Sequence, residues 1–217
     1  MVAGGFCMRT YGVWAVMLLL LFLVLIALLL GVDVQTVGVE GTSLGLARMN
    51  SYLLDMFGFH PWWYALSEWL GVVSLLVVAG FGLLALTQLI RRRSLKRVDQ
   101  SLYVLFALYG VLAFLYLFFE HVVLNYRPQS REPSFPSSHT LLVLFVMGSA
   151  CVLLSRMMHK GWKRHLLQGL CLLGMALTVL GRLLSGVHWS TDILGAVFLS
   201  ASLVFFFAAV VNKGGRR

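Results

Sequence analysis

Apolar residues dominate six long stretches of the chain, and short polar segments separate these stretches. Each stretch approaches the roughly 20 apolar residues that cross a bilayer as an α-helix. The pattern predicts an all-α integral membrane protein with six transmembrane helices, in which residues 1–217 form a single membrane domain. The predicted spans are approximately 11–31, 67–90, 101–124, 138–156, 165–184 and 190–211.

The first apolar run has the position of a signal peptide, but it is longer than the apolar region of such a peptide. No small-x-small cleavage site follows Gly31, so we expect an uncleaved span. In the loop over 32–66, the stretch 44–57 has apolar residues at helical spacing. This stretch predicts a helix lying in the membrane interface, with Trp62, Trp63 and Tyr64 as interfacial aromatics. An ordered loop without a role in binding is the alternative.

Composition and charge agree with a membrane protein and give its orientation. The chain is 60% hydrophobic and 12% charged, about half the charged fraction of a soluble domain. Its net charge of +9 comes from basic clusters between apolar segments, which is typical of cytoplasmic loops and argues against a nucleic-acid partner. One set of loops holds 13 of the 17 basic residues, so the positive-inside rule places both termini in the cytoplasm. These 13 residues are Arg9, Arg91, Arg92, Arg93, Lys96, Arg97, Arg156, Lys160, Lys163, Arg164, Lys213, Arg216 and Arg217.

The three cysteines, Cys7, Cys151 and Cys171, are far apart in the sequence and lie in or beside apolar segments. Their spacing matches no metal site, which favours a role in packing.

Charged and polar residues at the ends of the later spans are the candidates for chemistry, since charge is costly there. His188 and Asp192 are spaced i and i+4, so on a helix they share a face. The aspartate would then accept a hydrogen bond from one imidazole nitrogen and leave the other free to attack. A pair that only caps or orients the last helix is the alternative. Arg182, six residues before His188, would bind phosphate oxygens there.

The segment Pro136-Ser137-Ser138-His139 precedes a predicted helix, whose N-terminus is a natural anion site. Either serine would equally serve as an N-cap. His139 would be the acid that protonates a departing oxygen. Arg127, before a helix-ending proline, again suits phosphate, and Arg131 lies close to it.

These pieces share one predicted face of the membrane and hold the groups that phosphoryl transfer requires. Two arginines supply positive charge, and we see no acidic cluster that would hold a metal, so we expect no cofactor.

The three segments resemble the motifs of the type 2 phosphatidic acid phosphatase (PAP2) superfamily, whose pattern is Lys-x6-Arg-Pro, Pro-Ser-Gly-His and Ser-Arg-x5-His-x3-Asp. The resemblance implies a six-helix membrane enzyme in which His188 forms a phosphohistidine, Asp192 orients it and His139 is the general acid. It also implies that Arg127, Arg182, Ser137 and the backbone near Ser138 hold phosphate. The chain departs from the pattern at three positions, which are Glu120 for the motif lysine, Ser138 for glycine and Gly181 for serine.

We therefore expect a metal-independent lipid phosphatase, with undecaprenyl diphosphate, phosphatidylglycerophosphate or phosphatidic acid as the type of substrate. Its partners would be a phosphorylated lipid and the bilayer, in a bacterial plasma membrane, with the site on the extracellular or periplasmic side. Glu120 and Arg131 would be modulators, because a carboxylate disfavours a second negative charge nearby. The alternatives are a lipid phosphotransferase using the same site, and a non-catalytic lipid-binding protein in which Glu120 marks a decayed site. The sequence does not specify the oligomeric state.

Overall fold

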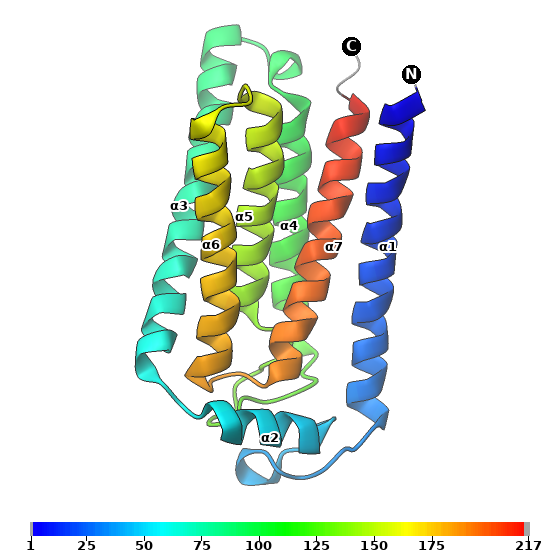
Figure 1. The fold of residues 1–217 in the computed structure, drawn as a ribbon, viewed down its shortest axis with the longest axis vertical. Coiled ribbons are helices and arrows are strands. Elements are labelled where there is room, and N and C mark those ends of the chain that lie inside the picture. Colours follow the sequence, from blue (N-terminus) through cyan, green and yellow to red (C-terminus); the bar gives the residue numbers. More distant parts are fainter. Residues whose placement is uncertain (1, 215–217) are drawn as a thin grey trace.

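The computed structural model describes residues 2–214, with side chains for residues 9–213. The described part of the chain is helical and contains six helices long and apolar enough to cross a membrane (Figure 1). It confirms the fold predicted from the hydropathy pattern. The α-helices are α1 (Val2–Gly31), α2 (Ala47–Phe57), α3 (Pro61–Arg92), α4 (Gln100–His121), α5 (Ser138–Met157), α6 (Trp162–Ser185) and α7 (Ser190–Gly214), with short 3₁₀ helices η1 (Val39–Gly41) and η2 (Leu95–Arg97).

Helix α3 starts earlier than the predicted bound. It begins at Pro61, six residues before the predicted 67, so Trp62, Trp63 and Tyr64 form its first turn instead of belonging to the loop. Proline fits the first helical position because its fixed φ is helical and its missing N–H has no partner there. α4 ends at His121, three residues before the predicted 124. The α1 helix starts at Val2, although its apolar span starts at Arg9.

Helix α2 lies across one end of the bundle, opposite the end that carries both termini (Figure 1). It is the helix predicted within 44–57, shortened at its start because Leu46 adopts a left-handed φ of 51°. The buried Asn50 ties α2 to the first turn of α7. Its Oδ1 accepts hydrogen bonds from Ser190 Oγ at 2.8 Å and from Thr191 N at 3.2 Å.

The long helices bury one side and expose apolar side chains on the other. α7 packs between α1 and α5, and α5 also contacts α3 and α6. Exposed residues such as Leu20, Leu76 and Phe114 give the outward faces an apolar surface suited to a bilayer. Cys151 on α5 and Cys171 on α6 are free and interact with each other, whereas the side chain of Cys7 lies outside the described part.

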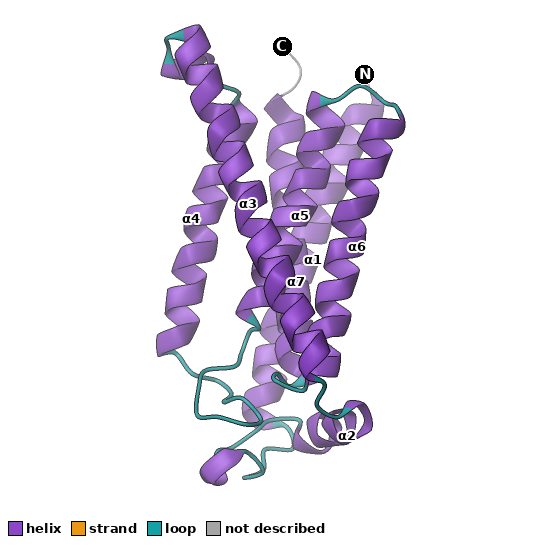
Figure 2. Cartoon of the chain, turned by 90° about the vertical axis from the view of Figure 1, so that its left-hand side faces the viewer, coloured by secondary structure: helices purple, strands orange, loops and turns teal. Residues whose placement is uncertain are grey.

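We call the end with α2, the loop 122–137 and the turn 186–189 the site end (Figure 2). The loop 122–137 is anchored to the bundle by Phe135, which is buried against α7. A Cβ on Gly195 would lie 2.5 Å from the Phe135 ring, so only glycine leaves room for it. The basic clusters between α3 and α4 and between α5 and α6 lie at the opposite end, and Arg216 and Arg217 fall outside the described residues.

Candidate active site

The loop 122–137 folds back on itself and brings its polar side chains over the start of α7. Tyr126 and Pro133 form an antiparallel bridge. Ser134 N donates to Asn125 O at 2.9 Å, and Arg127 N donates to the carbonyl of Glu132 at 3.0 Å. These backbone hydrogen bonds fix Asn125 and Ser134 next to each other.

His188 lies in the turn before α7, because the helix begins only at Ser190. The expected direct hydrogen bond to Asp192 is absent, since His188 Nδ1 lies 3.7 Å from Asp192 Oδ2. The Ser134 hydroxyl bridges the two groups. Its Oγ lies 3.0 Å from His188 Nδ1, and it donates a short hydrogen bond to Asp192 Oδ2. The connection is therefore a His188–Ser134–Asp192 relay.

The relay fixes the tautomer of His188. A hydroxyl donates one hydrogen, and Ser134 donates it to Asp192, so Ser134 Oγ must accept from Nδ1–H. The Asp192 carboxylate is buried and accepts two further hydrogen bonds, from Asn125 Nδ2 at 3.1 Å and from Trp189 N at 2.9 Å. His188 Nε2 consequently carries the lone pair, and it is buried without a hydrogen-bond partner.

Burial also keeps the His188 imidazole neutral. Removal from water lowers its pKa below the ordinary 6.5, and this effect exceeds the opposing influence of Asp192. The nearby Arg182 and Arg127 lower this pKa further. A neutral imidazole with an unpaired Nε2 is a competent nucleophile.

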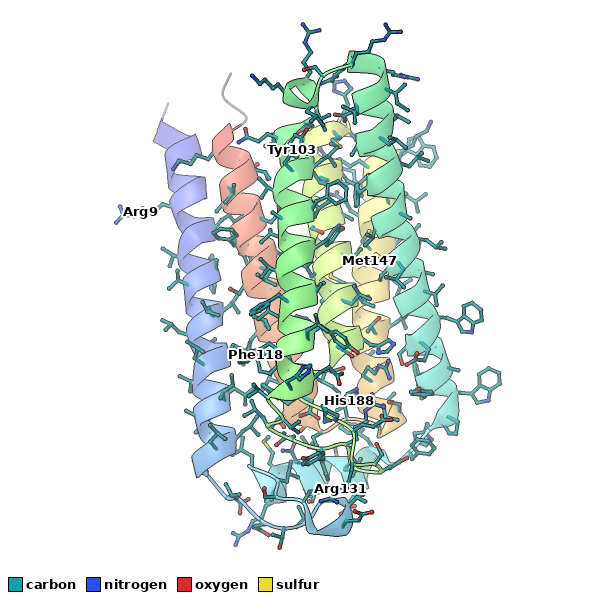
Figure 3. The ribbon with its side chains drawn as sticks, turned by 180° about the vertical axis from the view of Figure 1, so that it is seen from behind. Arg9, Tyr103, Phe118, Arg131, Met147 and His188 are labelled. Carbon is teal, nitrogen blue, oxygen red and sulfur yellow. The ribbon has the colours of Figure 1, made fainter. Side chains whose placement is uncertain are left out.

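A cavity of about 400 Å³ opens beside His188, bounded by α3, α4, α5 and the loop 122–137. Its polar end holds His188, His139, Ser134, Arg127 and Glu120. The remainder is mostly apolar, so the cavity suits a molecule with a polar head and a hydrocarbon body. Figure 3 shows His188 inside the bundle near the site end. The apolar lining residues include Leu75, Val78, Leu112, Phe119, Phe135 and Leu141.

The second histidine and the buried arginine meet at a carboxylate from α3. Glu68 Oε1 lies 2.6 Å from Arg182 Nη2, and Glu68 Oε2 lies 3.0 Å from His139 Nε2. The Arg182 side chain is 1% exposed, its guanidinium lies 5.4 Å from the Tyr64 ring centre, and its Nε has no partner. Arg182 is not among the residues that line the cavity, whereas His139 is.

The other predicted residues are distributed around this centre. Ser138 lines the cavity, whereas Ser137 is fully buried. Ser137 takes the N-cap position of α5, but its hydroxyl pairs with Thr140 Oγ1 at 3.0 Å and makes no capping hydrogen bond. Glu120 lines the cavity and interacts with Tyr116. Arg131 lies outside the cavity and pairs with Glu40 at 3.1 Å.

Three side chains at the centre were not found from the sequence, namely Ser134, Asn125 and Glu68. Ser134 and Asn125 reach Asp192 across 58 and 67 residues, and no local pattern indicates such contacts. Glu68 carried a usable signal, because it is an acid at the end of an apolar span. Among the described residues, no three histidine, cysteine or acidic side chains gather as metal ligands would.

The fold and the site together define a helical membrane protein with a buried His188–Ser134–Asp192 relay at one end. The model of the PAP2 superfamily matches residues 114–216, which contain all the motif residues. The resemblance predicted from the motifs is thereby confirmed, and the chain has a PAP2-type fold.

One solved structure supports this conclusion over nearly the whole chain. It is described as the first transmembrane PAP2 type phosphatidylglycerolphosphate phosphatase from Bacillus subtilis, and it superposes with a TM-score of 0.67 at 16% identity. The match covers 94% of this chain and 98% of that chain, and at this identity it shows the fold. No curated protein matches the chain in sequence. At the level of the family, these findings support a membrane lipid phosphatase.

Proposed function

We propose that this protein is a metal-independent phosphatase that hydrolyses a lipid phosphate monoester or diphosphate through a phosphohistidine at His188. The observation that carries the proposal is His188 Nε2, which is buried, unpartnered and adjacent to a cavity with an apolar body. Because Nδ1 carries the hydrogen, the lone pair of Nε2 is free to attack a phosphorus atom. The substrate types are those expected from the sequence, namely undecaprenyl diphosphate, phosphatidylglycerophosphate or phosphatidic acid.

The reaction would have two steps at the same phosphorus atom. His188 Nε2 attacks in line, the bond from phosphorus to the lipid oxygen breaks, and His139 donates a proton to that oxygen. Water then breaks the phosphorus–nitrogen bond, with His139 accepting its proton, and inorganic phosphate is released. Arg127, Arg182, Ser137 and the backbone around Ser138 would stabilise the phosphate oxygens. Glu120 and Arg131 would modulate binding, since Glu120 places a negative charge in the cavity.

Phosphate release with EDTA present tests this proposal. Purified protein in detergent is given the three lipids, and we expect turnover of at least one by the wild type and none by His188→Ala. His121→Ala is the matched control, because His121 lies at the same end but bonds only Leu117 O at 2.8 Å, outside the cavity. Full activity of His188→Ala would refute the nucleophile. Label appearing on an added lipid acceptor would indicate transfer, and binding without turnover would indicate the non-catalytic alternative.

A further inference from the structure

Glu68 connects three helices through one carboxylate. From α3 it pairs with Arg182 on α6 and with His139 on α5, at 2.6 Å and 3.0 Å. Its carboxylate is partly exposed, whereas Arg182 is buried. Glu68 takes no part in the two reaction steps proposed for His188 and His139.

The backbone of α3 lies close to His139 and to α6, and this close packing restricts where the Glu68 carboxylate can lie. A Cβ on Gly71 would lie 3.1 Å from His139 Cδ2, and a Cβ on Gly181 would lie 3.2 Å from Trp63 O. Because glycine has no Cβ, Gly71 and Gly181 allow α3 to lie against the His139 ring and against α6. Both Cδ2 and Nε2 of His139 therefore face α3, and Nδ1 lies on the opposite edge of the ring.

We propose that Glu68 is a positioning residue that orients His139 and pairs with its protonated ring, which serves as the acid for the departing lipid oxygen. This inference rests on the proposed function. The carboxylate accepts a hydrogen bond from Nε2–H, so Nδ1–H carries the proton that is transferred. When the bond from phosphorus to the lipid oxygen breaks, the oxygen keeps the electron pair and takes this proton, and His139 becomes neutral.

A protonated His139 has one positive and one negative neighbour in this cluster. Arg182 from α6 opposes a positive charge on the His139 ring. Glu68 attracts that charge, because its Oε2 lies 3.0 Å from His139 Nε2. It is also the counter-ion of the buried Arg182, so a substitution costs some stability in any case. A test must therefore separate acid catalysis from structural support.

Comparing substrates with different leaving groups separates acid catalysis from structural support. Phosphatidic acid releases a poor leaving group that needs a proton, whereas p-nitrophenyl phosphate releases a phenolate that needs none. For Glu68→Gln we expect kcat on phosphatidic acid to fall roughly 100-fold and kcat on p-nitrophenyl phosphate to change by less than about threefold. The control is Glu132→Gln, which removes the carboxylate 3.0 Å from Arg127 and should change both rates by the same factor.

Gly71→Ala is a second variant that displaces the His139 ring without changing any charge. We expect the same selective loss on phosphatidic acid, of smaller size, and this variant decides the matter if Glu68→Gln does not fold. An equal fall in kcat on both esters would show that Glu68 acts only as a counter-ion of Arg182, and would overturn the inference. A gain in activity would show that Glu68 blocks the site, with the same consequence. A wild type inactive on every lipid and on the aryl ester would instead overturn the proposed function, and this inference with it.

Discussion

At the scale of single residues, the site depends on a serine hydroxyl placed between a histidine and an aspartate. Because Asp192 lies 3.7 Å from His188 Nδ1, it orients the ring only through Ser134. The sequence predicted that His188 and Asp192 act together, since their spacing is local. It did not predict the intervening group, since Ser134 arrives from a loop whose position depends on the burial of Phe135 against Gly195.

Ser134→Ala tests this relay. Loss of the hydroxyl leaves His188 Nδ1–H without its acceptor, and we expect kcat to fall roughly 10- to 100-fold, by analogy with groups that orient metal-bound histidines. Ser200→Ala is the matched control, because the buried Ser200 hydroxyl donates to the carbonyl of Val197 in its own helix, at 3.1 Å, and does not line the cavity. Steady-state phosphate release at saturating lipid measures both variants. Unchanged kcat for Ser134→Ala would show that the relay is dispensable.

At the scale of elements, the hydropathy pattern predicted the long helices well, because each buries its backbone hydrogen bonds internally and exposes apolar side chains. It failed at the start of α3, where Pro61, Trp62 and Trp63 make the first turn less apolar than the rest. It also placed α2 correctly but gave no indication of its attachment. The buried Asn50 makes α2 a support for the start of α7, the helix that carries Asp192.

Asn50→Ala should loosen this support. The substitution leaves Thr191 N–H buried without its acceptor, so we expect the free energy of unfolding to fall by about 1–3 kcal/mol. Thermal unfolding in detergent measures the loss, and phosphate release should fall in parallel. Tyr52→Ala, at an exposed position of the same helix, should leave both quantities unchanged. Equal melting temperatures for the two variants would contradict a supporting role for α2.

At the scale of the whole molecule, charge and chemistry lie at opposite ends of the bundle. The loops around η2 and between α5 and α6, which carry the lysine and arginine clusters, lie at the end with the termini (Figure 1). The cavity lies toward the other end, beside His188 and the loop 122–137. Hydropathy and charge predicted this polarity. The shape of the cavity depends on the packing of α3, α4 and α5, which no sequence pattern specifies.

The charge distribution predicts that the termini are cytoplasmic and the site faces the opposite compartment. A green fluorescent protein fused to the C-terminus should therefore fluoresce in bacterial cells, whereas an alkaline phosphatase fused there should be inactive. The same two reporters fused after Arg93, between α3 and α4, should again give a fluorescent protein and an inactive alkaline phosphatase. The reverse pattern at both positions would place the site in the cytoplasm.

Because both termini lie at the end opposite the site, a tag or anchor can be attached there without approaching the cavity. α7 has 25 residues and is about 37 Å long at roughly 1.5 Å per residue, so an affinity tag or surface anchor at the C-terminus is a full helix length from the cavity. Protein immobilised through either terminus would present its reactive end away from the support. Detergent micelles or nanodiscs oriented this way would leave the loops around His188 free for substrate and for binding reagents.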